Sequence, residues 1–595
     1  MDHMAPTGGR SVADYVAAYA RLTQREDSFR VALVGNFTMQ WFQEALAVQA
    51  SEAGIPVEVF VGGYKQYAQE ILNPESDLYA FRPNMIFLCI DFASFAGDMV
   101  FLPYAQSVTE REAWVLEQFA LIRSFIDQLE NRLPDAVIIP HTFLVPSYSP
   151  LGILEEKEPF GFRESVRAFN EKLFAYAKQR SRVYVFDFDR FASAVGVDNV
   201  RDDRLYYLGD FAIAPDHIPA LTREYFRYIR AATWRTKKCI VLDLDNTLWG
   251  GVVGEDGIEG IRLGPTPEGR PYFEFQKHLL SLFQRGIILA VNSKNNEADA
   301  LKVFREHPYM VLKETQLAAV EINWNDKVDN LKRIAETLNI GLDSLVFIDD
   351  DPLNCAFVRE ALPEVAVVEL PKDPAHLVRA FTELPYFDAL QMTDEDKIKG
   401  RLYADEKKRT DLRTRMTSLE EYLKSLSMVM TIAPPSPMQF SRVAQLTQKT
   451  NQFTMTTRRY LESDIERFVQ QGEHRVYAVS LSDSFGDSGL IGVVIVLMAG
   501  EVWRLDSFLL SCRVIGRGVE DAILAHVIAE AKIAKAERII GEFISTKKNQ
   551  PAQGFFVRSG FTRLGVVHDV EEWEYDTSRP FPMPEHIQVN TTPYA

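Results

Sequence analysis

The sequence predicts a multidomain α/β protein, and three features support that fold class. The chain has 595 residues, more than one hydrophobic core usually organises, and 47% of them are apolar, as in ordinary globular proteins. Up to about residue 233, and again after residue 236, apolar runs of strand length alternate with amphipathic stretches, which is typical of parallel sheets flanked by helices. After Leu426 the apolar runs follow one another directly, which indicates an antiparallel sheet in an α+β domain.

The elements can be placed in order along the chain. In the first part, strands are expected at 30–38, 56–62, 83–92, 135–143 and 182–189, with a long amphipathic helix at 112–132. In the second part, strands are expected at 237–245, 286–293, 309–313 and 344–351. In the third part, strands are expected at 427–435, 474–483, 489–511 and 538–545, with a helix at 518–536. The chain is expected to begin with a flexible lead at 1–14, followed by a first α/β domain at 15–233 and a second α/β domain at 236–395. A charged helical connector at 396–420 is expected to lead to an α+β domain at 421–580 and a tail at 581–595.

Composition excludes several classes of protein. The net charge of −18 argues against a nucleic-acid binder, and no run approaches about 18 consecutive apolar residues, so no membrane span is expected. The four cysteines form no Cys-x-x-Cys pair, so a reducing, cytoplasmic location is expected. Cys89, Cys239 and Cys355 lie in apolar runs and are expected to be small core residues, whereas Cys512 lies in a different setting.

The stretch "VLDLDNTLWGG" places two aspartates at the end of an apolar strand. From there Asp243 can attack a phosphorus atom, and Asp245 can protonate the leaving oxygen and later activate water. Both carboxylates are also candidate ligands of a divalent cation. An Asp-x-Asp pair alone is common, so the residues that follow it decide the interpretation.

Three further motifs follow in sequence order, and together with the aspartates they resemble the haloacid dehalogenase (HAD) superfamily of phosphotransferases over about residues 236–390. Ser293 ends the next apolar strand, Lys294 follows it, and both are expected to bind phosphate together with Lys327. Asp349 and Asp350 end another strand and are expected to complete a Mg²⁺ site with the first two aspartates. The alternative is that each is a solvated loop residue.

Within that superfamily, "LDLDNTLWGGVVGEDG" and "SKNNEADAL" resemble the FkbH family, in which a HAD phosphatase domain of subfamily IIIC is joined to an acetyltransferase-like domain. The resemblance implies an enzyme that forms glyceryl thioesters on acyl carrier proteins for polyketide biosynthesis. Many relatives carry a cysteine just before the Ser-Lys-Asn, but here that position is Asn292, so it offers no thiol.

The third domain carries a different signature. "RVIGRG", at 513–518, precedes the expected helix, and glycines before a helix N-terminus expose N–H groups that bind phosphate. Together with "NQPAQGFFVRSGF" it resembles the Gcn5-related acetyltransferases (GNAT fold), and "LTQKTNQFTMTTRRY" extends the FkbH resemblance to about residue 575. The resemblance implies a site for the phosphopantetheine arm of a carrier protein at Arg513, Gly516, Gly518, Asn451, Gln452 and Asn549.

Cys512 stands directly before that loop, close to a helix N-terminus and to two arginines. Both neighbours favour the thiolate, so Cys512 is a candidate acceptor of an acyl group as a thioester. A small residue packed at the end of a strand is the alternative.

The first domain resembles SGNH hydrolases in its expected fold but lacks their serine. Asn36, Phe37 and Thr38 follow Gly35, and Asp216 and His217 are poorly placed for a catalytic pair. A non-catalytic α/β domain is therefore expected.

The predicted function is a bifunctional Mg²⁺-dependent enzyme. The resemblance implies that it takes the glyceryl unit of 1,3-bisphosphoglycerate, removes phosphate through Asp243, and loads D-glycerate or a related three-carbon acid onto an acidic acyl carrier protein or polyketide synthase module through Cys512. The alternative is a phosphatase fused to an acetyl-CoA-dependent N-acetyltransferase that acts on a small phosphorylated substrate. The carrier protein, the pathway and the oligomeric state do not follow from the sequence.

Overall fold

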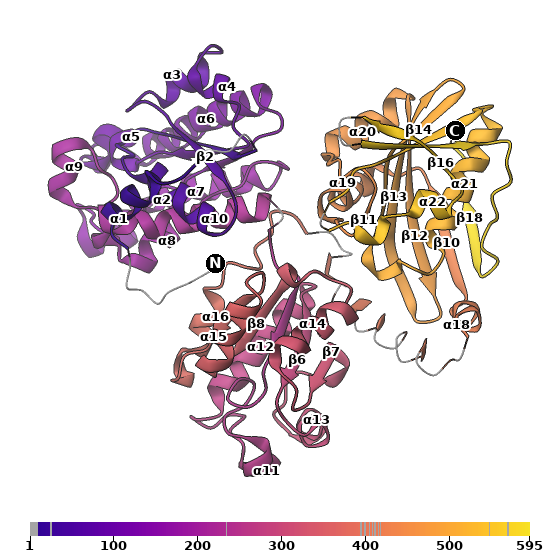
Figure 1. Cartoon of the computed structure of the whole chain (residues 1–595). Helices are drawn as coiled ribbons and strands as arrows, with labels where there is room; N and C mark the ends of the chain where they lie inside the picture. The colour runs from indigo at the N-terminus through magenta and orange to yellow at the C-terminus, as the bar shows by residue number, and fades with distance from the viewer. Residues whose placement is uncertain are drawn as a thin grey trace. The chain divides into compact units, whose positions relative to one another are not determined.

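The computed structural model describes residues 10–23, 27–233, 235–392, 396–397, 400, 402–403, 405–406, 409, 412–413, 416, 418–546, 548–567 and 570–594. The chain divides into two compact units, Met1–Thr233 and Trp234–Ala595 (Figure 1). Part of the connector expected at 396–420 lies outside the described residues, as do residues 1–9 of the expected lead.

The first unit is built on a parallel sheet with the strand order β2-β1-β3-β4. Alternate residues of β1 face opposite sides, so Val31 and Leu33 enter one core with α2 and α10 while Ala32 and Val34 enter another with α6 and α7. The strand expected at 182–189 is reduced to isolated bridges beside β4. The bounds are β1 Phe29–Gly35, α2 Phe42–Glu52, β2 Val57–Val61, β3 Met85–Cys89, α6 Val108–Arg132, β4 Val137–Pro140, α7 Phe162–Ala177 and α10 Ile218–Ala232.

The second unit begins with another parallel sheet, with the strand order β7-β6-β5-β8-β9. Ile240 and Leu242 of β5 pack against α12 and α13, and Cys239 and Val241 pack against α14 and α15. The central strand is therefore apolar throughout and ends where the first aspartate follows it. The bounds are β5 Cys239–Leu242, α12 Arg270–Gln284, β6 Ile288–Ser293, α13 Glu297–Glu306, β7 Leu317–Ile322, α14 Lys327–Thr337, β8 Leu345–Asp349, α15 Pro352–Ala361 and β9 Ala366–Glu369.

The C-terminal sheet has the strand order β16-β17-β15-β14-β13-β12-β10-β18, and β11 pairs with β14. Most pairs are antiparallel, but β14 and β15 run parallel because α21 connects them. One face packs against α21 and the other against α19 and α20. The bounds are β10 Met428–Ala433, α19 Phe440–Lys449, β11 Phe453–Thr454, α20 Glu462–Gln471, β12 His474–Asp483, β13 Gly486–Ala499, β14 Val502–Leu510, α21 Val519–Ile533, β15 Arg538–Phe543, α22 Phe555–Arg558, β16 Thr562–Val567, β17 Val570–Asp576 and β18 Ile587–Thr591.

Several expected elements differ in the structure. Residues 309–313 form turns, and the strand of that region is β7, which begins at Leu317. Helix α1 (Val12–Tyr19) begins inside the expected lead, at the capping box of Ser11 and Asp14. The expected tail contains β18, which pairs with β10 in parallel because its apolar Ile587 is buried there. In the described part of the chain, no helix is long and apolar enough to cross a membrane.

Candidate active site

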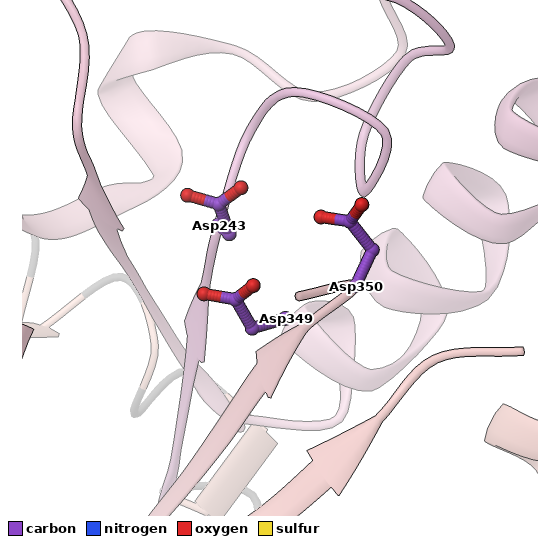
Figure 2. Close-up of side chains that lie close together, drawn as sticks. All are labelled: Asp243, Asp349 and Asp350. Atoms are coloured by element: carbon purple, nitrogen blue, oxygen red, sulfur yellow. The ribbon is translucent and has the colours of Figure 1, made fainter. Parts of the chain in front are cut away.

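Three carboxylates meet at the carboxyl edge of the β5–β9 sheet. Asp243 directly follows β5, Asp349 is the last residue of β8, and Asp350 follows it. One oxygen from each lies within 4.8 Å of the others, and Figure 2 shows the three side chains converging from these two neighbouring strands. Parallel strands end at the same edge, which is why residues about a hundred positions apart come together.

Lys327 is the cation of this cluster. It is the first residue of α14 and is only 2% exposed. Its Nζ donates to Asp243 Oδ1 at 2.5 Å and lies 3.2 Å from Asp349 Oδ2. Burial alone would lower the pKa of Lys327, but the charges of the two aspartates outweigh it and the pKa is raised. The ammonium group therefore stays charged inside the site.

Asn292 holds this lysine in place. Its backbone oxygen accepts a 2.6 Å hydrogen bond from Lys327 Nζ, and its side-chain Nδ2 donates to the Lys327 carbonyl at 2.9 Å. Asn330 Nδ2 donates to Asn292 Oδ1 at 3.0 Å. The Asn292 side chain is fully buried and points at α14, so it orients the lysine and does not line the opening of the site.

Asp245 is not one of the three clustered carboxylates, and its expected role as a metal ligand stays a prediction. Its Oδ1 accepts hydrogen bonds from the Trp249 indole at 2.8 Å and from the Val253 N–H at 3.0 Å. Its Oδ2 accepts from Asn295 Nδ2 at 2.8 Å. The loop after β5 thus holds Oδ1, and Asn295, which follows β6, holds Oδ2. The expected role in proton transfer stays a prediction.

The two remaining phosphate-binding candidates differ in burial. Ser293 is buried at the end of β6, beside the strand that carries Asp243. Lys294 follows it and is exposed. The structure thus places Ser293 at the sheet edge that holds the carboxylates, while Lys294 points into solvent.

The electrostatics of the cluster fit a hard divalent cation. Burial raises the pKa of Asp349, and the charge of Asp243 raises it further. Burial, followed by the charges of Asp243 and Asp349, raises the pKa of Asp350 to about 7. Among the described residues, no donor makes a hydrogen bond to the buried Oδ2 of Asp349, although Lys327 pairs with it as an ion. Clustered carboxylate oxygens lacking a donor are ligands that Mg²⁺ prefers.

The residues expected to bind pantetheine are held largely by the chain itself. Asn549 is buried and bonds to the carbonyls of Thr454 and Ile544 at 3.0 and 2.9 Å. Asn451 accepts a hydrogen bond from Arg459, and Gln452 beside it is half-buried. Gly516 and Gly518 both have a φ of +79°, which confirms only that the loop needs glycine there.

Cys512 lies in a short 3₁₀ turn, Cys512–Val514, between β14 and α21. Its Sγ lies 3.2 Å from the Tyr403 hydroxyl, and its carbonyl accepts a 2.6 Å hydrogen bond from Asn339. The side chain also packs at the edge of the core that includes Leu342 of the phosphatase-like part. These contacts are those of a packed residue, and the thioester role stays a prediction.

Sequence reasoning missed Trp249, Asn295 and Asn330. No local sequence pattern marks these residues. Each contributes by a hydrogen bond to another side chain of the site, and that contact depends on loop geometry or on a partner distant in sequence. In the first unit, Asn36 Nδ2 donates to the Asp91 carbonyl at 3.0 Å, and Asn36 Oδ1 accepts from the Asp91 N–H at 2.6 Å. Asn36, which stands just before the position where a hydrolase would carry serine, therefore joins two loops.

Comparison with solved structures extends these observations. The N-terminal part of the protein BF1531 from Bacteroides fragilis, described as containing a phosphatase domain complexed with Mg, matches 64% of this chain and 100% of its own, with 28% identity and a TM-score of 0.59. Two acetyltransferases match 25% of this chain: the ribosomal-protein-S18-alanine N-acetyltransferase of Escherichia coli (13% identity, 94% of that chain, TM-score 0.20) and the spermidine N-acetyltransferase of Vibrio cholerae with CoA and spermine (14% identity, 96% of that chain, TM-score 0.21). Such TM-scores are too low to assign function.

Comparison with sequences concerns the first unit. No curated protein matches the chain. Residues 30–229 match the family model described as FkbH, N-terminal domain, and the SGNH-like expectation for this unit is not confirmed. Residues 30–229 are therefore similar to the FkbH N-terminal domain, and the predicted resemblance to the FkbH family is confirmed over this part of the chain.

Proposed function

We propose that the protein is a phosphatase and acyltransferase that takes the glyceryl unit of 1,3-bisphosphoglycerate, removes phosphate and forms a glyceryl thioester on an acyl carrier protein. The observation that carries the proposal is the buried cluster of Asp243, Asp349 and Asp350 around Lys327. The similarity to a solved phosphatase domain supports its first half. The FkbH resemblance supports its second half.

The phosphatase reaction follows from the two aspartates after β5. Lys327 binds Asp243 Oδ1, which leaves Oδ2 to attack phosphorus and form an aspartyl phosphate. Asp245 gives its proton to the leaving oxygen as the P–O bond breaks. It then takes a proton from water as that water attacks the aspartyl phosphate, which releases phosphate and restores Asp243. Protons and charges balance over the two steps.

Asp243, Asp349 and Asp350 would hold Mg²⁺, the metal with which the similar Bacteroides fragilis domain is complexed. Bound there, the ion would supply positive charge against the phosphoryl oxygens. Lys327, at the start of α14, adds a second positive charge, and the hydroxyl of Ser293 at the end of β6 would donate to the same phosphoryl group. Asn292 keeps the lysine pointing at the carboxylates.

The acyl transfer uses an acyl phosphate, which is already activated and needs no ATP. In the proposed step the Cys512 sulfur attacks the carbonyl carbon at C1, the bond from C1 to the phosphate oxygen breaks, and the thiol proton leaves with the phosphate as hydrogen phosphate. The thiol of the carrier protein's phosphopantetheine arm then displaces Cys512. Release of Cys512 from Tyr403 would have to precede this attack, since the two side chains are in contact.

The test is to incubate the full chain with 1,3-bisphosphoglycerate, Mg²⁺ and a holo-carrier protein, then weigh both proteins and measure phosphate. Glyceryl adducts and phosphate release are expected in the native protein. Asp243→Asn should abolish hydrolysis of the phosphate ester, while Glu306→Gln, an exposed carboxylate on α13, should leave it unchanged.

Three outcomes separate the parts of the proposal. Absence of a glyceryl adduct from both proteins contradicts the glyceryl transfer. An adduct that persists on Cys512→Ser contradicts only the role of Cys512. Acetyl transfer from acetyl-CoA to an amine, unaffected by Cys512→Ser, would favour the N-acetyltransferase instead.

A further inference from the structure

The loop before α21, residues 513–518, has the glycine spacing of a phosphate-binding loop but is surrounded by the chain's own charged groups. We propose that this loop is an intramolecular clasp that holds the connector and the C-terminal segment, and that it does not receive the phosphates of coenzyme A or of a phosphopantetheine arm. The inference goes beyond the proposed function, because it concerns the approach of the arm and not the transfer of the glyceryl group.

A buried carboxyl group lies in the first turn of α21, beside the helix N-terminus at which a phosphate would bind. Glu520 is the second residue of α21 and is only 5% exposed, and Asp521 follows it in the same first turn. Glu520 Oε2 has no hydrogen-bond partner among the described residues. Burial raises its pKa, and the N–H groups of Glu520 itself and of Gly516 oppose that change. The N–H groups of Gly516 and Glu520 thus already interact with this carboxyl group, and a phosphate bound there would compete for them.

The loop's most promising cation is committed elsewhere. Arg517 is 6% exposed and forms ion pairs with Glu406 of the connector and, at 3.5 Å, with Asp483 at the end of β12. Arg409, also in the connector, binds both oxygens of Asp483 at 2.7 and 2.8 Å. Breaking such a buried network to bind phosphate would leave carboxylates unpaired, which is costly.

The C-terminal segment covers the open side of the loop. His586 donates through Nε2 to the Arg517 carbonyl at 2.8 Å. A Cβ atom at Gly518 would lie 3.2 Å from the His586 ring and 3.9 Å from Pro584. Gly518 is therefore needed for two reasons: the C-terminal segment approaches it closely, and its own φ is +79°.

The gap between β14 and β15 is closed as well. The two strands pair only from Val502↔Arg538 to Leu505↔Gly541. Beyond that point Met455 donates its N–H to the Phe508 carbonyl at 3.1 Å and accepts from the Ile544 N–H at 2.8 Å, so residues beside β11 join the two strands. The backbone groups that an extended pantetheine arm would need there already bond to the chain.

In the first experiment the full native chain is titrated with coenzyme A and, separately, with 4′-phosphopantetheine, and binding is measured by calorimetry. No saturable binding is expected up to about 1 mM, which corresponds to roughly −4 kcal/mol. Saturable binding that Gly516→Asn weakens would overturn the proposal, because the added side chain projects from the loop itself. Asn is the matched probe, since it tolerates the φ of +79° at this position and a Cβ there has nothing within 4 Å.

The second experiment tests the clasp by hydrogen exchange and thermal unfolding of Arg517→Ala. Faster exchange in β18 and α18 (Leu419–Ser425) and a lower Tm are expected. The control is Arg538→Ala, which removes an exposed arginine that pairs with Glu574 on the same sheet. This variant should leave the exchange rates and the Tm unchanged. Unchanged exchange and Tm in Arg517→Ala would overturn the clasp. Glyceryl loading is read by mass in a separate assay, so failure of the proposed function is distinguishable from failure of this inference.

Discussion

At the scale of the residue, Lys327 is both a functional and a structural cation. It neutralises Asp243 and Asp349 in a place where water is excluded. Removing one partner of a buried ion pair is more damaging than replacing both, because the remaining charge has no compensation. Function and stability should therefore both depend on this one side chain.

Lys327→Met is expected to lower kcat/KM for phosphate esters by roughly 10²- to 10³-fold, since one preorganised positive group is lost from the transition state. It should also lower the free energy of unfolding by about 3 kcal/mol without added cation, because buried carboxylates lose their partner. Steady-state kinetics and urea denaturation measure the two effects. Lys332→Met, an exposed lysine on the same helix, is the control, and a stability equal to the native protein would contradict this account.

Asn295 should act as a positioning residue through its hydrogen bond to Asp245 Oδ2. Asn295→Ala is expected to slow hydrolysis of alkyl phosphates by about tenfold, because the Asp245 carboxyl group is no longer oriented for proton transfer to the leaving oxygen. Aryl phosphates with acidic leaving groups need little protonation, so their hydrolysis should change less. An equal loss for both substrate classes, measured as kcat, would show that the residue acts only on folding or binding.

At the scale of the element, β11 is the part of the C-terminal sheet that most depends on one side chain. Asn549 bonds to the Thr454 carbonyl beside it and to the Ile544 carbonyl at 3.0 and 2.9 Å. Its Oδ1 also accepts from the Thr546 N–H at 2.8 Å. The side chain thus fixes a loop and a strand that are about a hundred residues apart.

Asn549→Ala is expected to lower the free energy of unfolding by about 2 kcal/mol, because buried carbonyls are left without donors. Gln553→Ala, an exposed amide a few residues later, should cost little. Chemical denaturation followed by fluorescence compares the two. A cost for Asn549→Ala no larger than for the control would mean that water or a neighbouring donor replaces the amide.

The sequence predicts the site best where a functional residue directly follows a recognisable strand. Asp243 and Asp349 end apolar strands, so their convergence follows from parallel topology. The orientation of Asp245 is not predictable, because Trp249 and Asn295 reach it through loop geometry. A pattern of glycines predicts a phosphate loop at 513–518, but the groups that surround it, Glu406, Asp483 and His586, come from remote positions.

At the scale of the whole molecule, the chain consists of two units that each have their own cores. All residues of the carboxylate cluster, together with Lys327 and its supporting amides, belong to the second unit. Residues 30–229, which match the model of the FkbH N-terminal domain, belong to the first. The phosphatase reaction should therefore not require residues of the first unit.

Residues 234–595 expressed alone are expected to fold and to hydrolyse small phosphate esters within about twofold of the full chain, because the chemical step uses only groups of this unit. Circular dichroism and phosphate release check the two statements. The matched variant carries Asp243→Asn in the same fragment and should be inactive. A folded but inactive fragment would show that the first unit contributes to the phosphatase site.

The pairing of β18 with β10 has a practical consequence for handling the protein. Tyr594, just after β18, donates its hydroxyl hydrogen to the Val476 carbonyl at 2.6 Å, so the end of the chain is tied into the sheet. A fluorescent label or affinity tag fused behind this residue would pull on a strand that lies beside the clasp. Labels belong before α1 instead, where the first helix begins at Val12 with its own cap.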